Sequence, residues 1–409
     1  MLWARDREAI RPPREVRQLP QNRSYGCLVS AKAVIFRPRR NADNRMNKAH
    51  ASQLALGLTV VFSLALLATK PETSARLESA VALGDSTRAA AAPGLDPAVY
   101  HHVAQLIWVV SDLDRVVDYW QRLGVHDIHR DGVVSFPNLT YRGEPDPARA
   151  RQVTANIGEL EIKWIQPLHG GKFWQDDLRK HGDGIRVLGY NVRSSQEFDD
   201  QIKWFSSKGV GVVVQNTWQG RTGRGRIAYL DTAAQGGGNT LALIDDPDTQ
   251  SRATDATGAG NEYPVTKINH FAWVVKDVRK VDTYYTGLGF KPFSSIDHNV
   301  SLDRVYRGQP GTFEMWLGWD RTGDASFEWV QQITGPDVYV EYGNKHGEGF
   351  HHLGVNVADM DEAIKLMTAR GAPPSQSAAW STPRGKGRAV YLDTEPYGGV
   401  TLELIYDPR

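Results

Sequence analysis

The chain has a single cysteine, Cys27, among its 409 residues. A disulfide framework within one chain is therefore excluded, and apolar cores must stabilise the domains. Net charge is also almost absent, because 48 basic side chains are balanced by 47 acidic ones to leave +1. A surface without a net positive field gives no electrostatic reason to bind a polyanion, so we expect no nucleic-acid partner.

Long apolar runs are scarce as well. One such run covers residues 54–68 (LALGLTVVFSLALLA), follows Met46 and Lys48, and precedes the small-residue site Ala80-Val81-Ala82. The run is too short to span a membrane comfortably, and this layout is typical of a secretory signal. We predict that residues 46–82 are a signal peptide and that the protein is secreted or periplasmic. A retained N-terminal anchor, and with it a membrane partner, is the alternative, and a cytoplasmic protein is less expected.

Composition divides the rest of the chain. Residues 1–45 are rich in Arg and Pro, which indicates a disordered segment or translated DNA upstream of the true start. Residues 83–98 are predicted to be a linker, and the Asp/Thr/Gly-rich stretch 249–263 a second one. These boundaries leave two domains, at 99–248 and 264–409.

An internal repeat relates these two domains. WVVSDLDRVVDYWQRLGV begins at Trp108, and WVVKDVRKVDTYYTGLGF begins at Trp273, 165 positions later. The same shift joins YRGEP at Tyr141 to YRGQP at Tyr306. A shift that is maintained over such a distance indicates that one domain has been duplicated.

Each domain divides again into two modules. In the C-terminal domain, one module reads as the strand INHFAWVV, the helix VRKVDTYYTGLG and three strands that end in SFEWVQQ. The other has FHHLGVNV, the helix DMDEAIKLMTARG, and final strands RAVYLD and VTLELIYD. A βαβββ module with one helix cannot cover both faces of its sheet, so two modules pair into an open β-cup. The predicted fold is α+β, with four modules in all.

Four residues of the C-terminal domain have metal-ligand chemistry and equivalent places in their modules. His270 and His352 lie in the first strands, and Glu328 and Glu403 in the last strands. Alternation along each strand directs these four side chains to the inner face of the cup. Burying their polar groups there without a partner would cost free energy. Two neutral imidazoles and two carboxylates around a divalent cation sum to zero charge. We therefore predict one divalent ion, which could be nickel, cobalt, manganese, iron or zinc.

The N-terminal domain has lost these residues. The repeat aligns His270, Glu328, His352 and Glu403 with Gln105, Lys163, Val187 and Ala242. Lysine, valine and alanine do not replace the missing ligands. We expect this cup to be metal-free.

Paired βαβββ modules with His/Glu/His/Glu in these strands resemble the vicinal oxygen chelate superfamily, which includes glyoxalases, bleomycin-resistance proteins and extradiol dioxygenases. The runs FEWVQQITGPDVYVEYGNKHGEGFHHLGVNV and GGVTLELI are most similar to the glyoxalase I and methylmalonyl-CoA epimerase branch. This resemblance covers both domains. It implies a lyase or isomerase that chelates two neighbouring oxygens of a small molecule and abstracts a proton next to a carbonyl. Glu403 would serve as both ligand and base.

Two other functions stay open. In an extradiol-type Fe²⁺ dioxygenase, His270, His352 and Glu403 would form a two-His-one-carboxylate site. A non-catalytic protein that binds a small molecule is the third possibility. Trp380, Arg388 and Tyr391 are candidate substrate contacts, whereas His351 should point to the opposite strand face in a packing or surface role.

Overall fold

The computed structural model describes residues 94–250 and 260–408. The predicted upstream segment 1–45 and signal peptide 46–82 lie outside these ranges, as do parts of both predicted linkers. Within the described ranges, no helix is long and apolar enough to cross a membrane.

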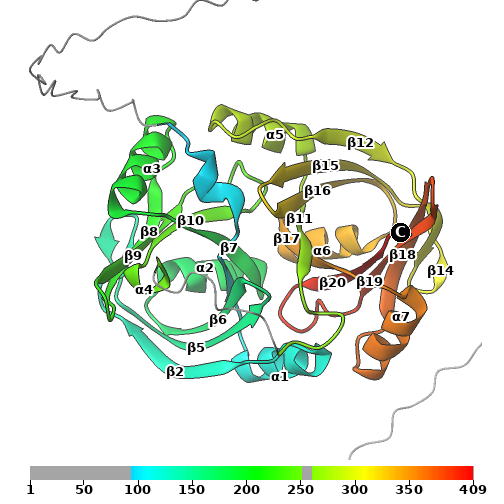
Figure 1. Ribbon diagram of the computed structural model, residues 1–409, viewed down its shortest axis with the longest axis horizontal. Helices are drawn as coiled ribbons and strands as arrows, with labels where there is room; N and C mark the ends of the chain where they lie inside the picture. The colour runs from blue at the N-terminus through cyan, green and yellow to red at the C-terminus, as the bar shows by residue number, and fades with distance from the viewer. Residues whose placement is uncertain (1–93, 251–259, 409) are drawn as a thin grey trace, which may run out of the picture. The chain divides into compact units, whose positions relative to one another are not determined.

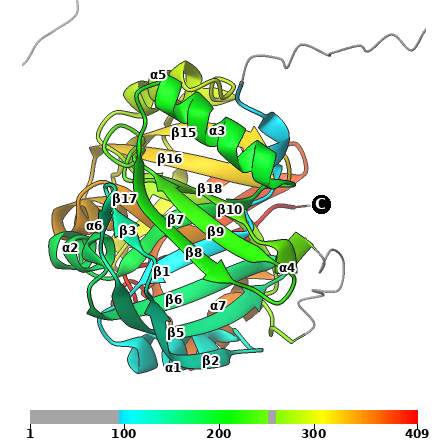
Figure 2. The same ribbon diagram turned by 90° about the vertical axis from the view of Figure 1, so that its left-hand side faces the viewer.

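The N-terminal domain is built on a ten-stranded sheet, which Figure 2 views from its own side of the molecule. In spatial order the strands are β2 (His129–Phe136), β5 (Ala148–Ile157), β6 (Leu160–His169), β1 (Gln105–Val109), β7 (Gly184–Asn191), β10 (Thr240–Asp245), β9 (Arg224–Leu230), β8 (Val212–Gln219), β3 (Thr140–Tyr141) and β4 (Glu144–Pro145).

The C-terminal domain repeats this sheet, strand for strand. Its order is β12 (Ser295–Asn299), β15 (Glu314–Thr322), β16 (Ala325–Thr334), β11 (Ile268–Val274), β17 (Gly349–Asn356), β20 (Thr401–Tyr406), β19 (Gly385–Leu392), β18 (Pro374–Thr382), β13 (Leu302–Tyr306) and β14 (Gln309–Pro310).

Each sheet is symmetric about its central pair of strands. In the C-terminal domain β11 and β17 are antiparallel, and each has the last strand of its own module, β16 or β20, as a parallel outer neighbour. The sheets curl into two cups (Figure 1). The predicted α+β architecture of four paired βαβββ modules is confirmed.

Helices α1, α2 and α3 have counterparts in α5, α6 and α7. The helices are η1 (Pro97–His101), α1 (Leu113–Leu123), α2 (Lys172–His181), α3 (Ser195–Ser207), α4 (Pro247–Gln250), α5 (Val278–Gly287), α6 (Val338–His346) and α7 (Met360–Ala369). Asp112 caps α1 by accepting from the backbone N–H of Arg115, and Asp277 caps α5 in the equivalent position. Helices α2 and α6 connect the two modules of each domain.

The buried apolar residues form three clusters, and the two that line the cups are separate from the large one. One large cluster joins the module helices to the outer sheet faces and contains residues of both domains, among them Trp108, Trp120, Trp273 and Trp329. Two smaller clusters line the inner face of the N-terminal and the C-terminal cup respectively. The cups are therefore backed by a continuous core that does not fill them.

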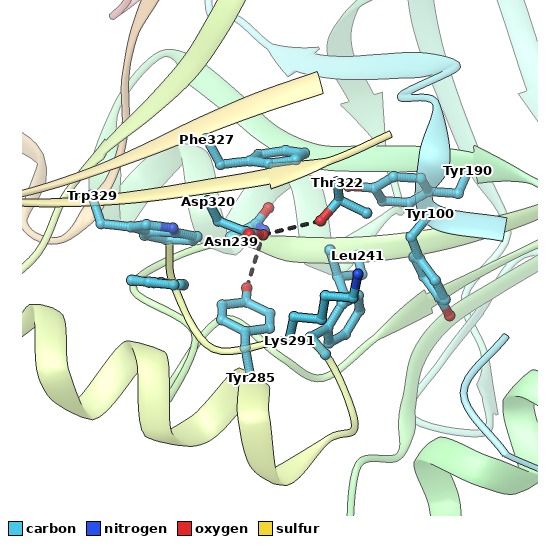
Figure 3. A pocket seen from close by; sticks show the side chains of 12 residues that line it. Tyr100, Tyr190, Asn239, Leu241, Tyr285, Lys291, Asp320, Thr322, Phe327 and Trp329 are labelled. Atoms are coloured by element: carbon cyan, nitrogen blue, oxygen red, sulfur yellow. Dashed lines mark hydrogen bonds between the residues drawn. The ribbon is translucent and has the colours of Figure 1, made fainter. Parts of the chain in front are cut away.

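Hydrogen bonds and an aromatic stack join the two repeats within this core. The indole N–H of Trp108 donates to the carbonyl of Gly398 at 2.6 Å, and the rings of Tyr119 and Tyr397 stack at 3.7 Å. Figure 3 shows a small cavity of about 40 Å³ between the repeats, where the Tyr285 hydroxyl accepts from the Asn239 amide at 3.1 Å.

Replacing Tyr285 with Phe should test this interface. The change removes the hydroxyl and leaves the buried Asn239 amide without its acceptor, which costs about 1–3 kcal/mol of unfolding free energy. Urea unfolding measures the loss. Tyr284→Phe is the matched control, because it removes a hydroxyl from a half-buried ring on the same helix and should cost less than about 0.5 kcal/mol. Equal losses would contradict the assigned role of the hydrogen bond.

Candidate metal centre

The four predicted ligands come from four neighbouring strands at the centre of the C-terminal sheet. Glu328, His270, His352 and Glu403 lie on β16, β11, β17 and β20, which are adjacent in that order. The imidazole of His270 crosses directly over Gly354, where an added Cβ would lie 2.4 Å from the ring. Glycine at that position is what lets the ring reach its neighbours.

His270, Glu328 and His352 each place one ligand atom within 4.8 Å of the others, and Glu403 approaches both histidines. His270 Nε2 lies 3.0 Å from His352 Nε2 and 3.0 Å from Glu403 Oε2. His352 Nε2 lies 3.1 Å from Glu328 Oε2 and 3.3 Å from Glu403 Oε2, and Glu328 Oε2 is 3.6 Å from His270 Nε2. Ligand atoms around one divalent ion, each about 2.0–2.2 Å from it, have separations of this size.

The donor set fits a divalent cation. All four side chains are buried, and the Oε2 atoms of Glu328 and Glu403 face only the ring nitrogens of His270 and His352, at 3.0–3.6 Å. Two buried carboxylates cost several kcal/mol unless positive charge balances them. A divalent ion held by two imidazoles and two carboxylates supplies that charge and leaves a neutral site.

Protonation in the absence of metal follows from the same geometry. Burial alone would lower the pKa of His352, but hydrogen bonds and attraction to Glu328 and Glu403 outweigh it and raise the pKa to about 9. Burial would raise the pKa of Glu403, yet contact with His270 and His352 lowers it below the ordinary value. A proton on His352 therefore partly balances the two carboxylates.

The Nδ1 atoms of His270 and His352 each contact a neighbouring side chain. His270 Nδ1 lies 2.9 Å from Asn269 Oδ1, and with a bound ion on Nε2 the proton would sit on Nδ1 and donate to that oxygen. His352 Nδ1 lies 2.8 Å from His351 Nδ1, and the His351 ring also hydrogen-bonds the backbone of Val338. Since burial lowers the pKa of His351 and keeps it neutral, its Nδ1 accepts the proton of His352 Nδ1.

The position of His351 corrects our expectation. It is neither exposed nor directed away from its neighbour, because the register shifts at this point. Ala272 pairs with His352 and Trp273 with Phe350, which makes His351 the extra residue of a β-bulge. A bulge interrupts the alternation of side chains, so strand periodicity alone could not predict that this side chain reaches His352.

The centre lies in a cavity of about 630 Å³ enclosed by the C-terminal cup. Trp380 and Tyr391, two of the candidate substrate contacts, line this cavity. The hydroxyl of Tyr391 lies 2.7 Å from that of Tyr339, which also lines it. The prediction for Arg388 is wrong. Arg388 alternates with the cup-lining residues of β19, and its guanidinium donates to Asp361 at the start of α7.

Among the described residues, the floor of the N-terminal cup has no equivalent cluster, although His102, Glu159 and Asp324 form a more exposed group of ligand-type side chains elsewhere. Gln105, Lys163, Val187 and Ala242 occupy the corresponding strands β1, β6, β7 and β10. The Gln105 amide donates to Glu161, and Lys163 Nζ lies 3.9 Å from the same carboxylate. The polar groups of this floor pair with one another instead of converging on one point.

Paired βαβββ modules that hold a His/Glu cluster on the floor of a cup define a class of metal-dependent enzymes built from duplicated domains. The sequence model of the Glyoxalase/Bleomycin resistance protein/Dioxygenase superfamily matches residues 102–229 and 269–391. The chain belongs to this superfamily.

Similar proteins include a 4-hydroxyphenylpyruvate dioxygenase from Dictyostelium discoideum. It is 22% identical over 293 residues, which cover 66% of this chain and 73% of the relative. Among solved structures, a mutant of 4-hydroxymandelate synthase from Streptomyces coelicolor is 14% identical, with a TM-score of 0.50. The match covers 75% of this chain and 92% of the synthase.

Metal binding should release a proton. In the metal-free protein His352, with a pKa of about 9, is protonated at pH 7, and it must lose the Nε2 proton to coordinate an ion. We expect about one proton per chain on adding Co²⁺ at pH 7, and an affinity that rises with pH until about pH 9. Indicator dyes in weak buffer measure the release. Proton uptake, or no release, at pH 7 would contradict the assignment, and above pH 10 the release should disappear.

Replacing His351 with Phe should weaken metal binding. His352 Nδ1 would lose its acceptor, and substitution of such outer partners typically costs 10–100-fold in metal affinity. His351→Gln keeps an acceptor and should recover part of the loss. Tyr342→Phe is the matched control, because Tyr342 packs on the His351 ring without contacting a ligand. Titration with Co²⁺, followed by its absorption spectrum, distinguishes these cases, and equal affinities for all four proteins would refute the role.

Proposed function

We propose that the chain is a metal-dependent dioxygenase that acts on a small molecule carrying two neighbouring oxygen atoms. The observation that carries the proposal is the convergence of His270, His352 and Glu403 at the buried floor of the C-terminal cup. Two histidines and one carboxylate are the ligand set typical of non-haem iron(II) oxygenases. The similarity to a 4-hydroxyphenylpyruvate dioxygenase over two thirds of the chain supports the same class of reaction.

A bound iron(II) ion would act as a Lewis acid and would pass electrons from the substrate, which is oxidised, to O₂. The protein's own contribution is position and exclusion of water. Apolar and aromatic side chains, including Phe313, Trp319 and Trp380, form the walls and hold a flat substrate above the floor. Tyr391 and Tyr339 place two linked hydroxyl groups within the same cup, where they can donate to a substrate oxygen.

Glu328 favours a second candidate, the glyoxalase or epimerase type of proton abstraction. Its Oε2 lies as close to His352 Nε2 as the oxygen of Glu403 does. A six-coordinate ion with four protein ligands has two places left, enough for a chelating substrate without O₂. Glu403 would then be the base that removes the proton next to a carbonyl. If residues 46–82 direct export, as we propose, cytosolic thiol cofactors would not be among its substrates.

Replacing Glu328 with Gln separates the two candidates. A dioxygenase needs only His270, His352 and Glu403, so the variant should still bind Fe²⁺ and consume O₂ in a screen of catechols and aromatic 2-oxo acids. The control Glu403→Gln should lose both properties. Chelation with EDTA should abolish uptake, and added Fe²⁺ should restore it.

A different result would support the second candidate. If wild-type protein consumes no O₂, and Glu328→Gln loses Ni²⁺ or Co²⁺ binding as fully as Glu403→Gln, the dioxygenase proposal is wrong. Metal-dependent exchange of a C–H proton for deuterium in hydroxycarbonyl compounds, followed by NMR, would then identify the alternative reaction.

A further inference from the structure

One amide on the wall of the C-terminal cup has a donor that the protein does not use. Gln376 lies on β18, is 2% exposed, and lines the cavity that holds the candidate metal centre. Its Oε1 accepts from the backbone N–H of Val338 at 3.1 Å, which fixes the orientation of the amide. The Nε2 group has no acceptor among the described residues. Nor is Nε2 one of the unpartnered atoms that are shielded from solvent, so its N–H groups reach the cavity that the residue lines.

The register of three adjacent strands places this amide at a defined distance from the metal centre. Glu403 of β20 pairs directly with Tyr391 of β19, and Tyr391 pairs directly with Gln376 of β18. Figure 1 shows these strands side by side in the wall of the cup. Paired residues point to the same face, and two strand spacings put the backbone of Gln376 about 10 Å from that of Glu403. That spacing suits a group at the far end of a molecule whose near end chelates the ion.

The start of helix α6 strengthens this donor. Val338 is the first residue of α6, and its N–H lies at the positive end of the helix. A hydrogen bond accepted by an amide oxygen polarises the amide and makes its N–H groups better donors. A buried donor without an acceptor costs free energy, which a ligand with an acceptor recovers.

The N-terminal cup has no such group at the equivalent position. The strand register aligns Gln376 with Val214 of β8, because each pairs with the tyrosine of the matching YRG segment. The first N–H of the equivalent helix α2, that of Lys172, donates to the Asp146 carboxylate instead. A helix start in this fold can therefore be capped without an amide on this strand, and the amide occurs in the copy that has the metal ligands.

The charge of the cup lining limits what this donor can recognise. No lysine or arginine is found among the described residues that line the C-terminal cup. His298 is the one further basic group beside the histidines of the centre, and its Nε2 lies 3.0 Å from Glu314. Asp407 adds a carboxylate to the lining. An anionic group away from the ion would thus meet no unpaired positive charge, whereas a neutral carbonyl oxygen meets the amide of Gln376.

We propose that Gln376 is a specificity-determining residue of the C-terminal cup. It selects molecules whose metal-chelating end is joined to an uncharged hydrogen-bond acceptor, such as a ketone or amide carbonyl. Gln376 Nε2 donates to this acceptor while Oε1 keeps its contact with helix α6. The inference rests on the proposed function in one respect, that the substrate chelates the ion through two neighbouring oxygens.

Two catechols of similar size test this preference in the Co²⁺-loaded full-length protein, with affinities measured by calorimetry at one pH without oxygen. 4-Acetylcatechol has a carbonyl group where 4-ethylcatechol has a methylene group. Gln376→Met should weaken binding of 4-acetylcatechol about tenfold, because one hydrogen bond is lost, and should leave the affinity for 4-ethylcatechol unchanged. The anionic 4-carboxycatechol should bind the wild-type protein more weakly than 4-acetylcatechol.

A second variant separates specificity from helix capping. Gln376→Glu keeps an acceptor for the Val338 N–H, so it should lose less thermal stability than Gln376→Met, yet it should weaken 4-acetylcatechol binding as well. The matched control is Ser377→Ala, which alters the next residue, on the opposite face of β18, and should leave both affinities unchanged.

The proposal is overturned if Gln376→Met weakens both catechols equally, as a purely structural residue would, or binds both as the wild-type protein does. It is also overturned if neither catechol binds the wild-type protein, or if 4-carboxycatechol binds more tightly than 4-acetylcatechol. None of these measurements involves O₂ consumption. Oxygen uptake by the Fe²⁺-loaded protein therefore tests the dioxygenase proposal separately.

Discussion

The C-terminal domain is organised around two carboxylates that are removed from water at the floor of one cup. Buried carboxylates without balancing charge carry a large cost, so the surrounding residues must bring positive charge to them. The strand order sets Glu328 and Glu403 on either side of the two histidine strands, and Gly354 clears the path for one imidazole. Asn269 and His351 contact the Nδ1 atoms of His270 and His352, so the Nε2 atoms of both histidines face the place that an ion would occupy.

Comparison of the two halves separates the scaffold from the chemistry. The β-bulge that brings His351 to the metal centre also occurs in β7, where Ile107 pairs with Val187 and Trp108 with Ile185. The extra residue there is Arg186, which is buried and pairs with Asp177. The irregular backbone is thus present in both copies although only one has the ligands. The β-bulge is therefore shared by both domains, whereas the side chain at the bulge differs between them.

The sequence was sufficient for the repeat, the module boundaries and the four converging residues, because each depends on local periodicity or on a fixed shift along the chain. Glu403 could be assigned to the inner face since its strand β20 pairs without a register shift. His351 could not, because one inserted residue reverses the alternation that follows it. Arg388 shows a different failure: it lies three residues from Tyr391, which places the two on opposite strand faces. Pairing of the short β13 with β18 of the other module is a long-range contact that no local pattern encodes.

One buried apolar cluster contains residues of both repeats and joins the two domains. Trp108 of the N-terminal domain donates to Gly398 of the C-terminal domain, and Tyr119 stacks on Tyr397. Separating the two domains would therefore expose a broad apolar surface on each of them. A C-terminal domain produced alone would expose its share of this apolar cluster to water. The N-terminal domain, which has no metal ligands of its own at these positions, therefore contributes to the shared core that supports the metal centre.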